Sequence, residues 1–104
     1  MTTALIAEDE PLMRDRLIAT LQKAGLTRFA PAEGAFYLYV DVSALTRDSV
    51  AFCRRLLAET GVATTPGRDF DPIHGDSWIR LSFAGSAEDI AEACHRLATW
   101  LPKQ

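Results

Sequence analysis

The stretch WIRLSFA at residues 78–84 has the alternation of a strand that separates two different surroundings. Ile79 and Leu81 fall on one face of such a strand, and Arg80 falls on the other, because successive side chains point to opposite sides. A second stretch, AFYLYVDV at residues 35–42, is aromatic and β-branched enough for a central strand. These two segments are the most clearly marked strands of the chain.

Three segments carry helical patterns of apolar residues. The first follows Pro11, which suits the first turn of a helix, and it ends at Gly25. The second ends at Gly61, and the third is bounded by Ser86 and Pro102. The side chains expected to face the core are Met13, Leu17, Ile18, Leu21 and Ala24 in the first helix, Val50, Cys53, Leu56 and Leu57 in the second, and Ile90, Ala93, Cys94, Leu97 and Leu101 in the third.

Two shorter strands complete the predicted order. The apolar run TALIA at residues 3–7 suits a buried strand that ends at the acidic residues 8–10, and residues 61–65 predict a short strand. Residues 30–34 and 68–77 have the composition of turns and loops. The order β-α-β-α-β-β-α predicts an α/β (α+β-like) domain with a small mixed sheet and helices packed on it.

Length and composition exclude several classes of protein. The chain has 104 residues, of which 48% are hydrophobic, and its net charge of −3 gives no basic surface for nucleic acid. This length predicts one domain over residues 1–104. No apolar run approaches the roughly 20 residues of a membrane span, and no basic region precedes an apolar one as in a secretory signal. Cys53 and Cys94 lack CxxC spacing, so we expect buried free thiols and a cytoplasmic protein. From the charge and the short apolar runs, we expect no contact with nucleic acid or membrane.

Three blocks of sequence carry a resemblance to a known family. They are PAEGAFYLY at residues 31–39, GVATTPGRDF at residues 61–70 and WIRLSFA at residues 78–84. From about Arg14 onward, the chain resembles the carboxy-terminal small domain of a class I/II (fold type I) pyridoxal-phosphate-dependent aminotransferase. The resemblance implies an aminotransferase small-domain-like fold for residues 26–104.

The beginning of the chain resembles a different family. The run ALIAEDEPL at residues 4–12 is similar to the opening of a response-regulator receiver domain, where an apolar strand ends in an acidic pair that holds Mg²⁺. Residues 1–25 would then be a receiver-like strand and helix. Residues 14–17 fit either family, which places the junction within residues 11–25. We interpret the chain as a chimera, and both an engineered fusion and a gene rearrangement remain open.

Arg80 is the strongest candidate for a binding residue. A guanidinium offers a planar fork of donors that matches a carboxylate in a bidentate way. The resemblance implies that the arginine of this strand binds the α-carboxylate of the substrate. The alternative is an ordinary strand arginine paired with a neighbouring acid.

Catalysis by this chain alone is not expected. Transamination needs a lysine that forms a Schiff base with the cofactor, and the chain has only Lys23 and Lys103. Neither lies in the Ser-rich setting that the resembled family uses, and in that family these parts belong to the large domain. We therefore expect no catalytic residue and no cofactor in this chain, although the full-length family uses pyridoxal phosphate. A partner chain that supplies the lysine is a further possibility.

A receiver-like signalling module is the alternative function. Glu8 and Asp9 could hold Mg²⁺ through carboxylate oxygens, with Asp41 as phosphate acceptor, but the lysine of that family has no counterpart. The simpler interpretation is that the two acids cap the first helix, and we expect no metal. His74 and His95 have no Cys or second His at the spacing of a zinc site.

The leading hypothesis is an aminotransferase small domain that is not catalytic alone. Such a domain exposes the surface that meets the large domain, and exposed apolar surface drives association. We therefore predict a homodimer or an exchange of the amino-terminal segment between chains. The amino-acid substrate stays open, because the side-chain pocket of the family lies largely outside these residues.

Overall fold

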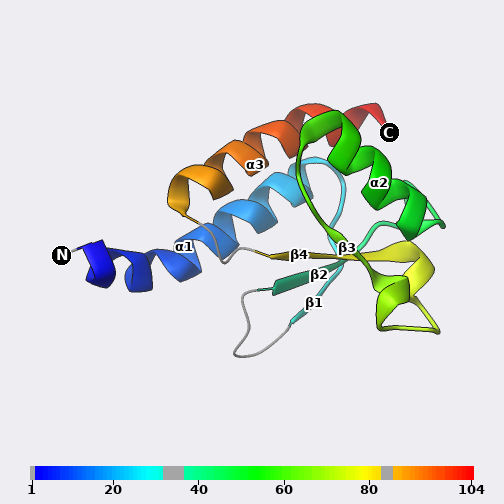
Figure 1. The fold of residues 1–104 in the computed structure, drawn as a ribbon, viewed down its shortest axis with the longest axis horizontal. Helices are drawn as coiled ribbons and strands as arrows, with labels where there is room; N and C mark the ends of the chain where they lie inside the picture. Colours follow the sequence, from blue (N-terminus) through cyan, green and yellow to red (C-terminus); the bar gives the residue numbers. More distant parts are fainter. Residues whose placement is uncertain (1, 32–36, 83–85) are drawn as a thin grey trace.

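The computed structural model of the chain describes residues 2–31, 37–82 and 86–104. The helices are α1 (Thr2–Lys23), α2 (Ser49–Thr60) and α3 (Ala87–Trp100). The strands are β1 (Phe29–Pro31), β2 (Tyr37–Asp41), β3 (Thr65–Pro66) and β4 (Trp78–Ser82), and three single 3₁₀ turns are η1 (Gly67–Asp69), η2 (Gly75–Ser77) and η3 (Leu101–Lys103). Figure 1 shows the three helices as a layer on one side of a small sheet.

The sheet has the order β1-β2-β4-β3, and each neighbouring pair is antiparallel. The predicted α/β (α+β-like) class, with helices packed on a small sheet, is confirmed, but the sheet formed by the described strands is antiparallel rather than mixed. The reason is the position of β4. The unit β2-α2-β3 does return its second strand in the direction of the first, but β4 lies between them and runs opposite to both.

The predicted strand at residues 3–7 is wrong, because α1 already runs through them. Short apolar runs do not distinguish a strand from a helix by periodicity alone. Residues 4–10 (ALIAEDE) are rich in Ala, Leu and Glu, which are strong helix formers. Pro11 therefore lies inside α1 rather than at its start, although a proline removes one helical hydrogen bond.

The core lies between the helix layer and the sheet, and it includes the amino-terminal helix. Met13, Leu17 and Leu21 of α1 are buried, which confirms the predicted stripe, and Gly25 follows the helix with a φ of 92°. α1 packs along α3, so that both helices share one core. The predicted stripe of α3 is also buried, apart from the half-buried Ala93.

The buried face of α2 differs from the prediction. Asp48 is the N-cap of α2 and accepts a hydrogen bond from the Ala51 N–H at 3.1 Å. Leu57 was expected to face the core but is 52% exposed, and Val50 is half-buried. The side chains that α2 buries are Ser49, Phe52, Cys53 and Leu56, which follow the i, i+3, i+4, i+7 spacing from the first helical residue.

The central strands separate two faces, as their alternation predicts. Leu38, Val40, Ile79 and Leu81 are buried in the core that the sheet shares with the helices. The prediction for residues 61–65 is correct only at its end, because β3 is limited to Thr65–Pro66. The predicted turn at residues 30–34 overlaps β1, a strand that the sequence did not predict. Residues 32–34 of that turn lie outside the described residues, as do residues 35–36 and 83–84 of the two predicted central strands.

We use one name for the face of the sheet that points away from the helices. The open face consists of Tyr37, Tyr39, Trp78 and Arg80 from the two central strands, together with Phe70 from the connection between β3 and β4. Across the described parts of the chain, no helix combines the length and apolar character that a membrane crossing requires.

Candidate functional site

Arg80 lies at the middle of β4 on the open face. Its Cα is paired with Tyr39 of β2 and with Thr65 of β3. The guanidinium carbon lies 4.3 Å from the centre of the Tyr37 ring and 5.3 Å from the centre of the Phe70 ring. Among the residues that the structure describes, no carboxylate lies within ion-pair distance of this guanidinium. The Arg80 guanidinium is therefore packed against two rings and has no acidic partner among these residues.

Tyr39 contacts two other aromatic side chains of the open face. Its ring centre lies 5.1 Å from that of Phe70 and 4.9 Å from that of Trp78, with the Trp78 ring stacked at 28°. Its hydroxyl donates a hydrogen bond of 2.9 Å to Asp71 Oδ2. Burial and the neighbouring Asp71 carboxylate raise the pKa of the Tyr39 hydroxyl. The hydroxyl is therefore a stable hydrogen-bond donor at neutral pH.

The loop that carries Phe70 is folded tightly on itself. A Cβ atom on Gly75 would lie 2.4 Å from the Gly67 carbonyl oxygen, so that only glycine allows the two backbone segments to touch. Ser49 of α2, which is 1% exposed, donates its hydroxyl to the Gly75 carbonyl oxygen at 2.6 Å. The Ile73 and His74 N–H groups both donate to Asp71 Oδ1, at 3.2 and 3.1 Å. These contacts fix the loop between the helix layer and the open face.

The comparison with known proteins identifies the family. The sequence profile of "Aminotransferase class I and II" matches residues 11–97. The chain belongs to the class I and II aminotransferase family. It is 54% identical over 91 residues to the valine–pyruvate aminotransferase of Mycobacterium tuberculosis, with 88% of this chain covered. It is 41% identical over 85 residues to the aspartate aminotransferase of Thermotoga maritima, with 82% of this chain covered.

Solved aminotransferase structures share the fold. A crystal structure of an aminotransferase from Mycobacterium tuberculosis superposes with a TM-score of 0.87 at 49% identity, over 95% of this chain and 26% of that chain. The aspartate aminotransferase of Thermotoga maritima gives a TM-score of 0.74 at 37% identity, over 94% of this chain and 24% of that chain. The chain thus spans about a quarter of the length of these aminotransferases; the two curated relatives are covered over 24% and 21% of their lengths.

The comparisons give no support to a receiver-like beginning. Glu8 and Asp9 were expected at the end of a strand, but they lie within α1, which removes the strand-end arrangement that the magnesium alternative required. The described residues include no group of three or more His, Cys, Asp and Glu side chains that could hold a metal ion.

Asp41, the acceptor in the signalling alternative, is already engaged within the fold. It is 9% exposed, accepts from the Ser43 N–H at 2.8 Å, and forms an ion pair with Arg28 at 3.3 Å. Burial acts to raise the pKa of Asp41, but the Ser43 hydrogen bonds and the Arg28 charge outweigh it and lower that pKa. The ring of Trp78 lies under the Arg28 guanidinium, with 5.9 Å from its carbon to the ring centre. Asp41 thus links the end of β2 to Arg28, which lies just before β1.

The residues of this chain do not by themselves fit the pyridoxal phosphate of the family. Such a site needs a lysine for the Schiff base and a partner for the ring nitrogen. Lys23 is an exposed residue in the last turn of α1, and Lys103 is an exposed residue of η3. Both lie in the helix layer, whereas Arg80 belongs to the open face on the other side of the sheet.

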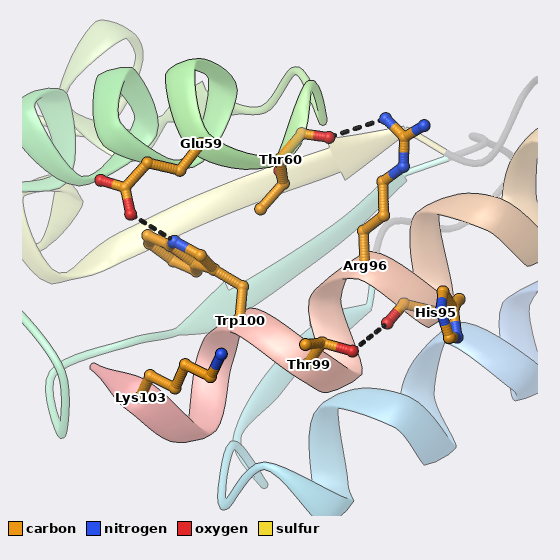
Figure 2. Close-up of a pocket in the computed structure, with 7 residues that line it drawn as sticks. All are labelled: Glu59, Thr60, His95, Arg96, Thr99, Trp100 and Lys103. Carbon is orange, nitrogen blue, oxygen red and sulfur yellow. Dashed lines mark hydrogen bonds between the residues drawn. The ribbon is translucent and has the colours of Figure 1, made fainter.

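Lys103 borders a groove of about 510 Å³ between α2 and α3 (Figure 2). Two hydrogen bonds cross between the helices here. Trp100 Nε1 donates to Glu59 at 2.8 Å, and Arg96 donates to the Thr60 carbonyl oxygen at 2.8 Å. Polar groups of Glu59, Arg96 and Trp100 are thus used in joining α2 to α3. The residues that line the groove are Glu59, Thr60, His95, Arg96, Thr99, Trp100 and Lys103.

Sequence reasoning selected Arg80 and missed the side chains around it. Tyr37 and Tyr39 could have been found, because they alternate with buried residues on β2 just as Arg80 does on β4. Phe70 and Asp71 gave no such signal, since they lie in a loop whose position depends on contacts far along the chain.

Proposed function

We propose that this chain is the small-domain part of an aminotransferase, that it is not catalytic alone, and that Arg80 binds the α-carboxylate of the amino-acid substrate. The observation that carries the proposal is the environment of Arg80. Arg80 is half-buried, and its guanidinium lies against Tyr37 and Phe70 and has no acidic partner among the described residues. A charge held in this way is available for an acidic ligand.

The chemistry of an arginine favours a carboxylate as that ligand. The planar guanidinium donates two parallel hydrogen bonds to the two oxygens of a carboxylate. The relatives are named for valine with pyruvate and for aspartate, and the α-carboxylate is the group that these compounds share. The pyridoxal phosphate of the family, which forms a Schiff base with a lysine and with the substrate amine, would be held by the three quarters of the enzyme that this chain does not span.

A graft tests the role of Arg80. Residues 11–97 would replace the matching segment of the Mycobacterium tuberculosis valine–pyruvate aminotransferase, and transamination would be measured. We expect an active enzyme in which Arg80→Gln raises the KM for the amino acid at least tenfold, as loss of a charge-assisted pair predicts. Arg54→Gln, at an exposed arginine of α2, is the matched control and should leave KM unchanged. An unchanged KM in Arg80→Gln would contradict the proposal.

A cofactor titration tests whether the chain is catalytic alone. The 104-residue chain would be titrated with pyridoxal phosphate, reduced with borohydride and analysed by mass spectrometry. We expect no saturable Schiff base, because Lys23 and Lys103 are exposed and lie outside the open face. Stoichiometric trapping at either lysine, reversed by an amino acid, would show that the chain has a cofactor site of its own.

We also propose that the open face, together with the loop that carries Phe70 and Ile73, associates with another protein surface. Tyr37, Phe70 and Ile73 are 38%, 47% and 82% exposed, and exposed apolar groups of this size favour association. In an isolated chain the partner would be a second copy. Light scattering of the chain at high concentration should show a dimer, and a mass equal to one chain would reject it.

A further inference from the structure

We propose that Tyr37 and Phe70 are positioning residues for Arg80. Their rings hold the guanidinium group in one orientation, and the strength with which Arg80 binds a carboxylate depends on them. This inference rests on the proposed role of Arg80. It assigns to both side chains a role in orienting Arg80.

The first step is the compatibility of ring contact with carboxylate binding. The Arg80 guanidinium carbon lies 4.3 Å and 5.3 Å from the ring centres of Tyr37 and Phe70, within the roughly 6 Å over which a cation is attracted to an aromatic face. Contact of this kind uses the positive charge of the guanidinium rather than its N–H groups. The five N–H donors of the guanidinium can therefore still bind a carboxylate.

The second step is how the rings themselves are held. Tyr37 and Tyr39 are two residues apart on β2 and therefore share a face. The Phe70 ring lies 5.1 Å from the Tyr39 ring, and the Tyr39 hydroxyl donates to Asp71, the residue that follows Phe70. Phe70 is thereby fixed through both its ring and its backbone neighbour. The arrangement places one ring from a strand and one ring from a loop at the same guanidinium.

The third step is that these rings contribute little to the core. Tyr37 is 38% exposed and Phe70 is 47% exposed, whereas Leu38, which follows Tyr37, is only 4% exposed. Large aromatic side chains at such exposed positions gain only part of the free energy of burial. Within this chain, their contact with a charged group explains their placement better than packing in the core does. Their removal should therefore leave the fold intact.

The order of the Arg80 side chain is the direct test. Nitrogen-15 relaxation of the Arg80 Nε–Hε group would be measured in the 104-residue chain, in Tyr37→Leu, in Phe70→Leu and in the double variant. We expect an ordered side chain in the parent. In the double variant we expect it to become as mobile as Arg54, which is exposed on α2. Tyr37→Phe and Phe70→Tyr keep the rings and should keep the order.

Carboxylate binding is the second readout on the same samples. Acetate would be titrated while the Arg80 Nε–Hε signal is followed, with Arg80→Gln as the variant that should not bind. Loss of one ring should weaken binding about two- to five-fold, as an exposed cation–π contact predicts. Thermal unfolding would confirm that every variant is folded.

The two readouts separate the failure of this inference from the failure of the proposed function. If Arg80 stays equally ordered in the folded double variant, the rings do not position it and the inference is overturned. If acetate does not bind the parent chain while Arg80 loses order in the double variant, the positioning role stands and the carboxylate role of Arg80 in this chain fails. Weaker binding together with lost order would support both.

Discussion

On β2 and β4, the same backbone presents two faces that are held in different ways. The face toward the helices carries Leu38, Val40, Ile79 and Leu81, none more than 4% exposed, in a continuous apolar core. The open face is held by ring stacking, by hydrogen bonds to Asp71 and by the close contact of two glycines. Alternation along a strand thus lets one segment stabilise the fold and present a binding group at once.

The difference between the faces separates stability from binding. Apolar burial makes a large contribution to stability and has no preferred direction. Substitutions on the face toward the helices should therefore act mainly on the free energy of unfolding. The contacts of the open face are directional and partly exposed, so changes there should act mainly on the geometry around Arg80. The following predictions compare the two faces, and the expected effects decrease from one to the next, apart from the control variants Leu57→Ala and Gly25→Ala.

The largest effect is expected from Phe52→Ala in α2. Phe52 is fully buried, and its ring meets that of Trp100 edge-on at 5.4 Å between centres. Truncating such a ring removes apolar contact and leaves a cavity, which costs about 3–5 kcal/mol of unfolding free energy. Urea denaturation followed by circular dichroism measures this loss. In samples that remain folded, the Arg80 side chain should keep its order, because the open face is unchanged.

Leu57→Ala in the same helix is the matched control. Leu57 was predicted to face the core but is 52% exposed. Its truncation should change the unfolding free energy by no more than about 0.5 kcal/mol, as is usual for surface substitutions. A loss as large as that of Phe52→Ala would mean that the buried face of α2 is the one predicted from the sequence.

The next effect is expected from Gly75→Ala, which breaks the support of the open face. The new Cβ would lie 2.3 Å from the Gly67 backbone carbon, so that the two segments must separate. Overpacking of this kind costs about 1–3 kcal/mol. Because Gly67 also lies against the Tyr39 hydroxyl, the separation should displace the Tyr39 ring and the Trp78 ring stacked on it. Chemical shifts of the Tyr39 and Trp78 rings should therefore change together with stability.

Gly25→Ala distinguishes crowding from backbone strain. Gly25 follows α1 with a φ of 92°, and no atom lies within 4 Å of a Cβ built there. An alanine in this left-handed conformation costs about 1–2 kcal/mol without any clash. Stability should fall while the Tyr39 and Trp78 ring signals stay in place. A shift of those signals in Gly25→Ala would show that they report general destabilisation and not the open face.

The sequence predicted those parts of the fold whose signals are local. The stripe of α1 after Pro11, the cap at Ser86 and the alternation around Arg80 each depend on neighbouring residues, and the structure confirms them. The strand predicted at residues 3–7 failed because a short apolar run fits either structure. The antiparallel arrangement of the sheet was also not predicted, because the position of β4 between β2 and β3 depends on pairing of distant segments.

The candidate site could likewise be predicted only where its signals are local. Arg80 could be selected from the chemistry of its side chain and from its strand. The Phe70 ring reaches Arg80 only because Gly67 and Gly75 touch and Ser49 holds the loop to α2. These contacts cannot be predicted from the sequence of residues 68–77, whose composition indicates only a loop.

A smaller effect is expected from Tyr39→Phe, which keeps the ring and removes one hydrogen bond. The lost bond joins the Tyr39 hydroxyl to Asp71 Oδ2 at 2.9 Å. A net loss of about 1 kcal/mol is typical of a single intramolecular hydrogen bond. We expect this loss in urea denaturation, with the stacking of Tyr39 on Trp78 retained in ring chemical shifts. A loss near that of Phe52→Ala would mean that the open face is as important for stability as the core.

The smallest effect concerns protonation of Asp71 at acid pH. Hydrogen bonds from the backbone N–H of His74, from the Tyr39 hydroxyl and from the Ile73 N–H outweigh a burial effect of opposite sign and lower the pKa of Asp71. Since the folded-state pKa lies below the unfolded value of about 3.9, the carboxylate stabilises the loop above that pH. This stabilisation is lost as the pH falls through the folded-state pKa.

The loop amides report this titration directly. We expect the Ile73 and His74 amide signals to shift together at a pH below the usual range of Asp, because both N–H groups donate to Asp71 Oδ1. Asp71→Asn should abolish that step. Asp41→Asn, at the end of β2, is the matched control: it should abolish the step seen at the Ser43 amide, which donates to Asp41 Oδ1, and leave the loop amides unchanged. If the loop amides still titrated in Asp71→Asn, another group would control the loop, and Asp71 would not anchor the support of the open face.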